Sequence, residues 1–423
     1  MKTSIAAAAL LCCSAAATAQ SSVTLFGVLD AGVSYYTAKS SFYNNTNQSV
    51  APPQTPPAGV RRSQTVMSNS GTSNSRLGFR GVEDLGGGWA AGFWLEAALA
   101  NDAGGATFFS RRSTVSLSGP IGEIRLGRDF TPTFWNDSLF SPFSTIGVGA
   151  NVISAVGTNL AVARGPGSAT AASDNYLRTN NSIGYFLPPN LGGIYGQVQY
   201  ALHENVSQSG QVGSPSHKGQ FAGGRLGYAA GAFDIALAYG KSVAADTTGL
   251  GATGQPNGVN LDEKLKTLNL GASYNLGFMK LFGELSRVKD QRASTAPGAT
   301  GLLLTRDDDR YNGCLVGVTV PVGAGLIKAA YSKVRFDNDL GSAAGPSRDA
   351  SVDKIAVGYE HNLSKRTALY VTAARVRARN AQNNPAVMGV ATGTAAYLST
   401  GAGTTGYAPA RSTGYDLGIR HAF

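Results

Sequence analysis

The sequence predicts an all-β fold, a transmembrane antiparallel β-barrel of about sixteen strands. Three observations support this prediction: the composition, the alternation of apolar and polar residues, and short turns that alternate with long loops. The 423 residues include 55 Gly, 17 Tyr and 17 Phe, and only 14% are charged. This composition excludes a highly charged disordered chain, and three Cys are too few for a disulfide scaffold. No apolar run reaches the roughly 18 residues that a membrane-spanning helix needs.

The start of the chain has the pattern of a cleaved signal peptide. Lys2 is the positive n-region, Ile5 to Leu11 is a short apolar core, and Ala17-Thr18-Ala19 fits the small-x-small cleavage rule. We therefore expect residues 1–19 to be a signal peptide and residues 20–423 to form the mature barrel.

The chain is basic, with a formal net charge of +10. In a cytosolic protein this balance would suggest nucleic acid, but the export signal argues against that partner. The basic residues stand singly within alternating segments instead of forming blocks. This distribution predicts a wet, positive interior surface.

Short turns and long loops alternate along the mature chain. Tight turns containing Gly, Asn or Pro are expected at Asp84–Gly88, Pro120–Gly122, Asn190–Gly193, Ala229–Ala232, Asn275–Phe278, Val322–Gly325 and Asn362–Arg366. Long polar connections are expected at Thr37–Asn74, Pro132–Arg178, Ser242–Glu263, Asp290–Asp309, Asp337–Val352 and Arg379–Arg411. Such loops are unusual in a soluble domain, whereas short turns on one side and long loops on the other are typical of outer-membrane barrels.

The last segment, Ser412–Phe423, carries the clearest strand pattern. Apolar residues of one parity would face lipid, and Asp416, Gly418 and Arg420 of the other parity would face the lumen. The chain ends on an aromatic residue, Phe423.

The sequence offers no pattern for catalysis, a cofactor or a metal. The four His are scattered and lack zinc-helix spacing, and there is no G-x-S-x-G elbow. The G-x-G-x-x-G matches at Gly249–Gly254 and Gly401–Gly406 lie in polar segments without a strand–helix context. Asp307–Asp309 lacks EF-hand spacing and is interpreted as a solvated loop tip. Cys314, the one cysteine left after cleavage, is interpreted as a packing residue.

Four segments of the sequence resemble the general trimeric porins of Gram-negative outer membranes, in particular the beta-proteobacterial type. They are Ser21–Tyr36, Ser75–Gly88, Phe109–Pro132 and Gly414–Phe423, in the family's order and spacing. The resemblance covers the whole mature chain. It implies an outer-membrane barrel of about sixteen strands, a homotrimer, and a pore narrowed by the third long loop folded inward. It also implies that Phe423 is an assembly signal.

The resemblance further implies a constriction with basic residues on the wall and acidic residues on the inward loop, Pro132–Tyr176. Strict alternation would point Arg111 outward and Arg112 inward, a conflict that a β-bulge could repair, so both remain candidates. Aromatic residues at the start of the loop could wedge it against the wall. The candidate constriction residues are Arg76, Arg80, Arg111, Arg112, Arg128, Asp137, Arg164 and Arg178.

The favoured function is passive diffusion of small hydrophilic solutes and ions, with a preference for anions, through a barrel surrounded by outer-membrane lipids. No catalytic step is expected. One alternative is an outer-membrane barrel enzyme, which would need a Ser or Asp placed against a His at the rim. Another is an adhesin or binding protein without a conducting pore, which cell fractionation and conductance would distinguish.

Overall fold

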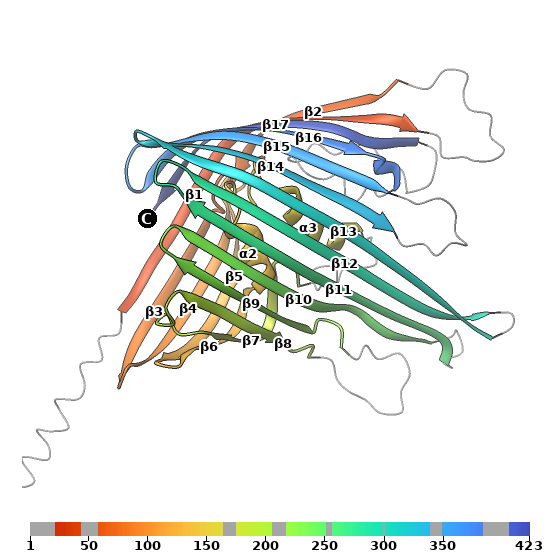
Figure 1. Cartoon of the computed structure of the whole chain (residues 1–423), viewed down its shortest axis with the longest axis horizontal. Helices are drawn as coiled ribbons and strands as arrows, with labels where there is room; N and C mark the ends of the chain where they lie inside the picture. Colours follow the sequence, from red (N-terminus) through yellow and green to blue (C-terminus); the bar gives the residue numbers. More distant parts are fainter. Residues whose placement is uncertain are drawn as a thin grey trace, which may run out of the picture.

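Antiparallel strands follow one another along the chain and close into a barrel (Figure 1). The computed structural model describes residues 22–43, 58–163, 175–204, 217–250, 256–298, 301–338, 349–383 and 406–423. The barrel closes where the first strand, β1, pairs with the last, β17, in a register that joins Val28 to Ala422. The proposed signal peptide lies outside the described residues and stays a prediction.

The strands of the first half alternate with short and long connections. They are β1 (Ser22–Tyr43), β2 (Val60–Asn69), β3 (Arg76–Gly86), β4 (Trp89–Ala100), β5 (Gly105–Gly119), β6 (Gly122–Phe130), β7 (Arg178–Phe186) and β8 (Ile194–Ala201). The second half consists of β9 (Phe221–Ala230), β10 (Phe233–Leu250), β11 (Pro256–Asn275), β12 (Lys280–Gly298), β13 (Gly301–Val322), β14 (Gly325–Asn338), β15 (Ala350–Asn362), β16 (Thr367–Arg379) and β17 (Gly406–Ala422). A 3-10 turn, η2 (Ala381–Asn383), follows β16.

Two of these segments, β2 and β3, share one place in the barrel. The far half of β1 pairs with β2, and its near half, Ser22–Val28, pairs with β3. The break between them is ordered by the Asp30 carboxylate, which accepts from the backbone N–H groups of Gly71, Thr72 and Ser73 at 3.2, 2.8 and 2.7 Å. The described segments therefore form a closed barrel of sixteen strand positions, which confirms the predicted fold class.

The predicted short turns are confirmed, and glycine shapes most of them. Gly231, Gly277 and Gly323 each have a φ of +56° to +87°, a conformation that glycine adopts without the Cβ penalty of other residues. In Figure 1 these turns gather at the left end of the barrel.

Two of the predicted long loops are largely strand. Ser242–Glu263 lies mostly within β10 and β11, and Asp290–Asp309 lies mostly within β12 and β13, where Asp290 pairs with Asp309. These hairpins run beyond the other strands (Figure 1). The prediction failed because the two-residue hydrophobic period that lipid imposes on a strand is absent from these segments of the sequence.

Side chains alternate between an apolar outer face and a polar inner face. In β17, Leu417 and Ile419 are exposed on the outside, whereas Asp416 on the other parity is buried inside. Cys314 also lies on the outer parity of β13 and is exposed, so it does not pack in the interior of the barrel. A small apolar side chain suits that lipid-facing position.

The long connection between β6 and β7 folds into the barrel, as predicted for the inward loop. It contains α2 (Pro132–Leu139) and α3 (Val152–Ala163). Both helices lie inside the ring of strands (Figure 1), where α2 packs on β9–β11 and α3 packs on β13–β15. Among the described residues no helix is long and apolar enough to cross a membrane.

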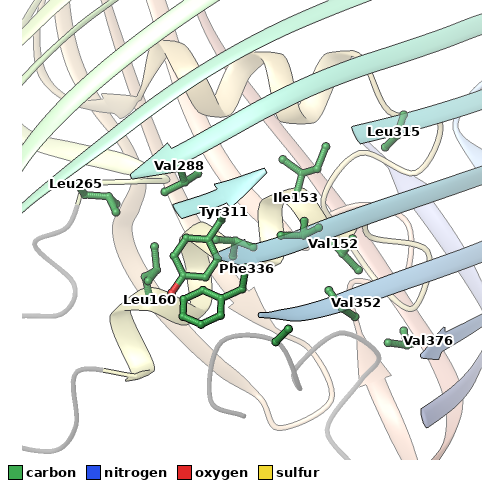
Figure 2. Packing of buried hydrophobic residues seen from close by; sticks show 13 residues of the cluster. Val152, Ile153, Leu160, Leu265, Val288, Tyr311, Leu315, Phe336, Val352 and Val376 are labelled. Carbon is green, nitrogen blue, oxygen red and sulfur yellow. The ribbon is translucent and has the colours of Figure 1, made fainter. Parts of the chain in front are cut away.

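The main hydrophobic core of the described chain lies between α3 and the barrel wall. One face of α3 carries apolar residues at helical spacing, and they meet apolar side chains from β11–β16 (Figure 2). The helix contributes Val152, Ile153, Val156 and Leu160. Inward-facing wall residues that would be polar in an open channel are apolar here because the loop covers them.

Candidate pore constriction

The inward loop leaves a cavity of about 600 Å³ between itself and the opposite wall. The wall contributes basic side chains from β3, β5 and β7, and the loop contributes small polar and aromatic ones. Among the described residues, the charged side chains lining this cavity are Arg76, Glu96, Arg111, Arg112 and Arg178. Four positive charges thus face one negative charge, so the lining is strongly positive.

Glu96 organises the centre of the basic wall. Its Oε1 accepts a hydrogen bond from Arg111 Nε at 2.5 Å and lies 3.9 Å from Arg76 Nε. The Glu96 side chain is 9% exposed, so its interaction with Arg111 is less screened than a surface ion pair. The glutamate attracts both guanidinium groups and offsets part of their mutual repulsion.

A register irregularity brings both consecutive arginines of β5 to the lumen. Glu96 pairs with Arg112, but Ala98 pairs with Thr107, so several residues of β5 stand opposite a single residue of β4. Phe109, within this insertion, has a φ of +50°. Because the alternation is interrupted here, Arg111 and Arg112 line the same cavity.

Aromatic rings support two of the arginines. The guanidinium carbon of Arg178 lies 4.2 Å from the ring centre of Phe130, and that of Arg112 lies 4.6 Å from the indole of Trp94. A guanidinium stacked on a ring keeps its N–H edge available for an anion. These contacts hold positive charge at fixed positions along the wall.

Two of the predicted basic candidates, Arg80 and Arg128, lie apart from this cavity. Arg80 lies outside the lining of this cavity, in a neighbouring pocket nearer the short turns. Arg128 donates to the Ser110 carbonyl and to Asn180 Oδ1. The register shift between Gly127 and Asp129 changes the parity around Arg128, which sequence alternation does not reveal. Arg164 lies outside the described residues.

Asp137 is placed differently from the acidic lumen residue that was expected. It is 1% exposed, and it accepts hydrogen bonds from Tyr176 OH and from Asn269 Nδ2, the latter at 2.7 Å. Burial raises the pKa of the Asp137 carboxyl above its ordinary value, although the hydrogen bonds oppose this shift. The buried Glu284 carboxyl faces it from β12. Asp137 thus anchors α2 to the wall and does not line the cavity.

Wall glycines give the loop room to dock. A Cβ on Gly271 would lie 2.0 Å from Phe140 Cδ2, and one on Gly317 would lie 2.5 Å from Pro142 Cγ. Beside them, Asn136 Nδ2 donates to the Ala236 carbonyl at 2.9 Å. The expected wedging of loop aromatics against the wall is thus seen at Phe140, which is 1% exposed.

Strand alternation gives the inward parity of Glu96 and Trp94 but does not show which residues lie beside them. Both share the inward parity of β4, opposite the exposed Phe93, and both lie beside the arginines of β3 and β5 in the register. The sequence does not show which residues of β3 and β5 pair with them, and this register was the missing information.

Among the described residues no group of three or more His, Cys, Asp or Glu could hold a metal ion.

A closed barrel with an apolar outside, a polar inside and a loop-narrowed lumen is a transmembrane β-barrel channel. The model of the Gram-negative porin family matches residues 6–382. The chain belongs to this family, and its barrel is an outer-membrane porin.

Relatives support the same assignment across the full chain. Outer membrane porin protein 32 of Delftia acidovorans is 36% identical over 427 residues, covering 100% of each chain. The structure of an anion-selective porin from Comamonas acidovorans is 33% identical, with a TM-score of 0.65 over 96% of this chain and 100% of that one. The trimer form of in-vitro folded OmpT from Vibrio cholerae shares the fold, at 13% identity and a TM-score of 0.58 over 95% and 99% of the two chains.

Proposed function

We propose that this porin is an anion-preferring diffusion channel whose selectivity is set at the cavity between the inward loop and the basic wall. The observation that carries the proposal is the charge of that lining, with Arg76, Arg111, Arg112 and Arg178 against Glu96. The similar Comamonas porin is described as anion-selective, which supports the same preference here.

The mechanism needs no chemical step and no energy source. The inward loop limits the size of the solute, and the arginines create a positive potential in a narrow passage with low-dielectric walls. An anion is attracted into this passage, whereas a cation is repelled. Water and small uncharged solutes pass according to size.

The proposal includes a homotrimer, as the resemblance to trimeric porins implies. The trimer form of the structurally similar OmpT supports this assembly. Each subunit would contribute its own channel, because the loop and the wall that line the cavity come from one chain.

Planar-bilayer recording of the purified protein tests the channel function. The parent should insert and give discrete conductance steps, and liposomes containing it should swell faster in small sugars than in large ones. Folded protein that inserts without conductance steps would contradict the channel and would favour the adhesin or enzyme alternative.

A further inference from the structure

A second pocket of about 440 Å³ lies on the same wall, between the constriction and the short turns. We define the lower arginine pocket by Thr24, Arg80, Trp94, Arg112, Arg125 and Glu123, which come from β1 and β3–β6. Trp94 and Arg112 line both cavities, so a solute that leaves the constriction meets this pocket next. We propose that the lower arginine pocket binds small monocarboxylates that carry a short apolar tail.

Arg80 is the available cation of this pocket. In the described part of the chain, neither an ion pair nor a hydrogen bond reaches its guanidinium group, which instead lies 5.4 Å from the Trp94 ring centre and 5.7 Å from that of Phe26. A planar guanidinium with a free N–H edge binds a carboxylate through two parallel hydrogen bonds, which a spherical halide cannot form. This geometry favours carboxylates over chloride.

The neighbouring charges limit the ligand to a single negative charge. Arg125 is bound to Glu123 at 2.8 Å and to Asp129 at 2.6 Å. Arg112 lies 3.7 Å from Asp129 and donates to Thr114 Oγ1, so it is partly neutralised. A second carboxylate on the ligand would approach Glu123 and be repelled.

The remaining lining suits a short apolar tail. The indole of Trp94 lies between the guanidinium groups of Arg80 and Arg112 and gives the pocket an aromatic surface. Gly92 adds no side chain, which leaves space beside Ser116. A ligand that joins a carboxylate to a few carbon atoms can use both the charge and this surface, whereas chloride uses only the charge.

Tryptophan fluorescence provides a binding assay that does not depend on conduction. The chain has 3 Trp, so Trp89→Phe and Trp135→Phe together leave Trp94 as the reporter inside the pocket. Butyrate is the probe, n-butanol is its uncharged counterpart, and chloride is the simple anion at the same ionic strength. Arg366→Ser is the matched control because Arg366 is an exposed arginine in a short turn at the same end of the barrel.

Butyrate should change the Trp94 emission saturably, whereas n-butanol and chloride should not. Arg80→Ser should weaken butyrate binding at least tenfold, Arg80→Lys several-fold because the charge remains without the planar fork, and Arg366→Ser should have no effect. An equal response to chloride, no saturable response, or unchanged affinity in the Arg80 variants would overturn the proposal. Bilayer conductance of the same preparations keeps the two proposals distinguishable, since binding without conductance would contradict only the channel.

Discussion

Replacing Gly271 with alanine should push the inward loop off the barrel wall and narrow the channel. A Cβ at this position would lie 2.0 Å from Phe140 Cδ2. Carbon atoms pack best at about 3.5–4.0 Å, so the ring must retreat from the wall by roughly 1.5 Å, toward the lumen. Phe140 is the C-cap of α2, so the end of the helix should move with it. Overpacking of this kind costs about 1–3 kcal/mol, or a factor of about 5 to 150 in the occupancy of the docked position.

Single-channel conductance at high salt measures this displacement, because electrostatic effects fade there while the width of the passage remains. We expect lower conductance for Gly271→Ala and partial recovery in Gly271→Ala/Phe140→Leu, which removes ring volume. Gly283→Ala is the matched control on the adjacent strand, since its Cβ would meet nothing closer than 3.9 Å. Folded Gly271→Ala protein that conducts like the parent would refute the reasoning.

Three further predictions follow from the fold and the loop anchor. The protein should migrate in unheated detergent samples as an oligomer and collapse to one monomer band on boiling; identical monomer migration in both samples would contradict the trimer. Deleting Phe423 should lower the folded yield in the outer membrane, because its ring fills the space beside Gly27 and its backbone exchanges hydrogen bonds with Gly27 at 3.0 and 3.1 Å; equal yields would exclude this role. Because the pKa of Asp137 is raised in the folded protein, the folded state keeps a proton that the unfolded chain releases. The resulting stabilisation of the folded state is complete below the ordinary pKa of 3.8 and declines as the pH rises from there toward the raised value. Heat resistance of the parent should therefore fall over that pH range, and that of Asp137→Asn should fall less. An equal fall in both proteins would contradict the raised pKa of the buried Asp137 carboxyl.

The barrel itself was predictable because lipid and water impose a two-residue period on each membrane-crossing strand. That period placed Leu417 and Asp416 on opposite faces correctly. The period does not extend beyond the membrane, so the long hairpins at Ser242–Glu263 and Asp290–Asp309 were taken for loops.

The candidate site was only partly predictable, because irregular backbone and long-range packing decide it. A register shift beside Gly127 carries Arg128 away from the cavity, and another brings Arg111 into it. Asp137 was expected to face the lumen because the resemblance to trimeric porins implies acidic residues on the inward loop. Its burial against Asn269 depends on how α2 docks on β11, a contact between residues far apart in sequence.

We propose that the basic wall makes the channel select anions. Neutralising two of the four arginines, in Arg76→Gln/Arg178→Gln, leaves Arg111 and Arg112 against Glu96 in the lining. One guanidinium about 7 Å from an anion contributes roughly 2 kcal/mol at an effective dielectric constant near 20, and about 1 kcal/mol after screening at a Debye length of about 8 Å. Each removal should therefore lower the anion concentration in the passage by a factor of about 5.

The decisive measurement is the reversal potential across a planar bilayer under a KCl gradient, for the parent and for Arg76→Gln/Arg178→Gln, with Arg366→Gln as the control. We expect an anion-selective potential for the parent and the control, and a clear shift toward zero for the double variant. A cation-selective parent, or a double variant with the parent's reversal potential, would contradict it.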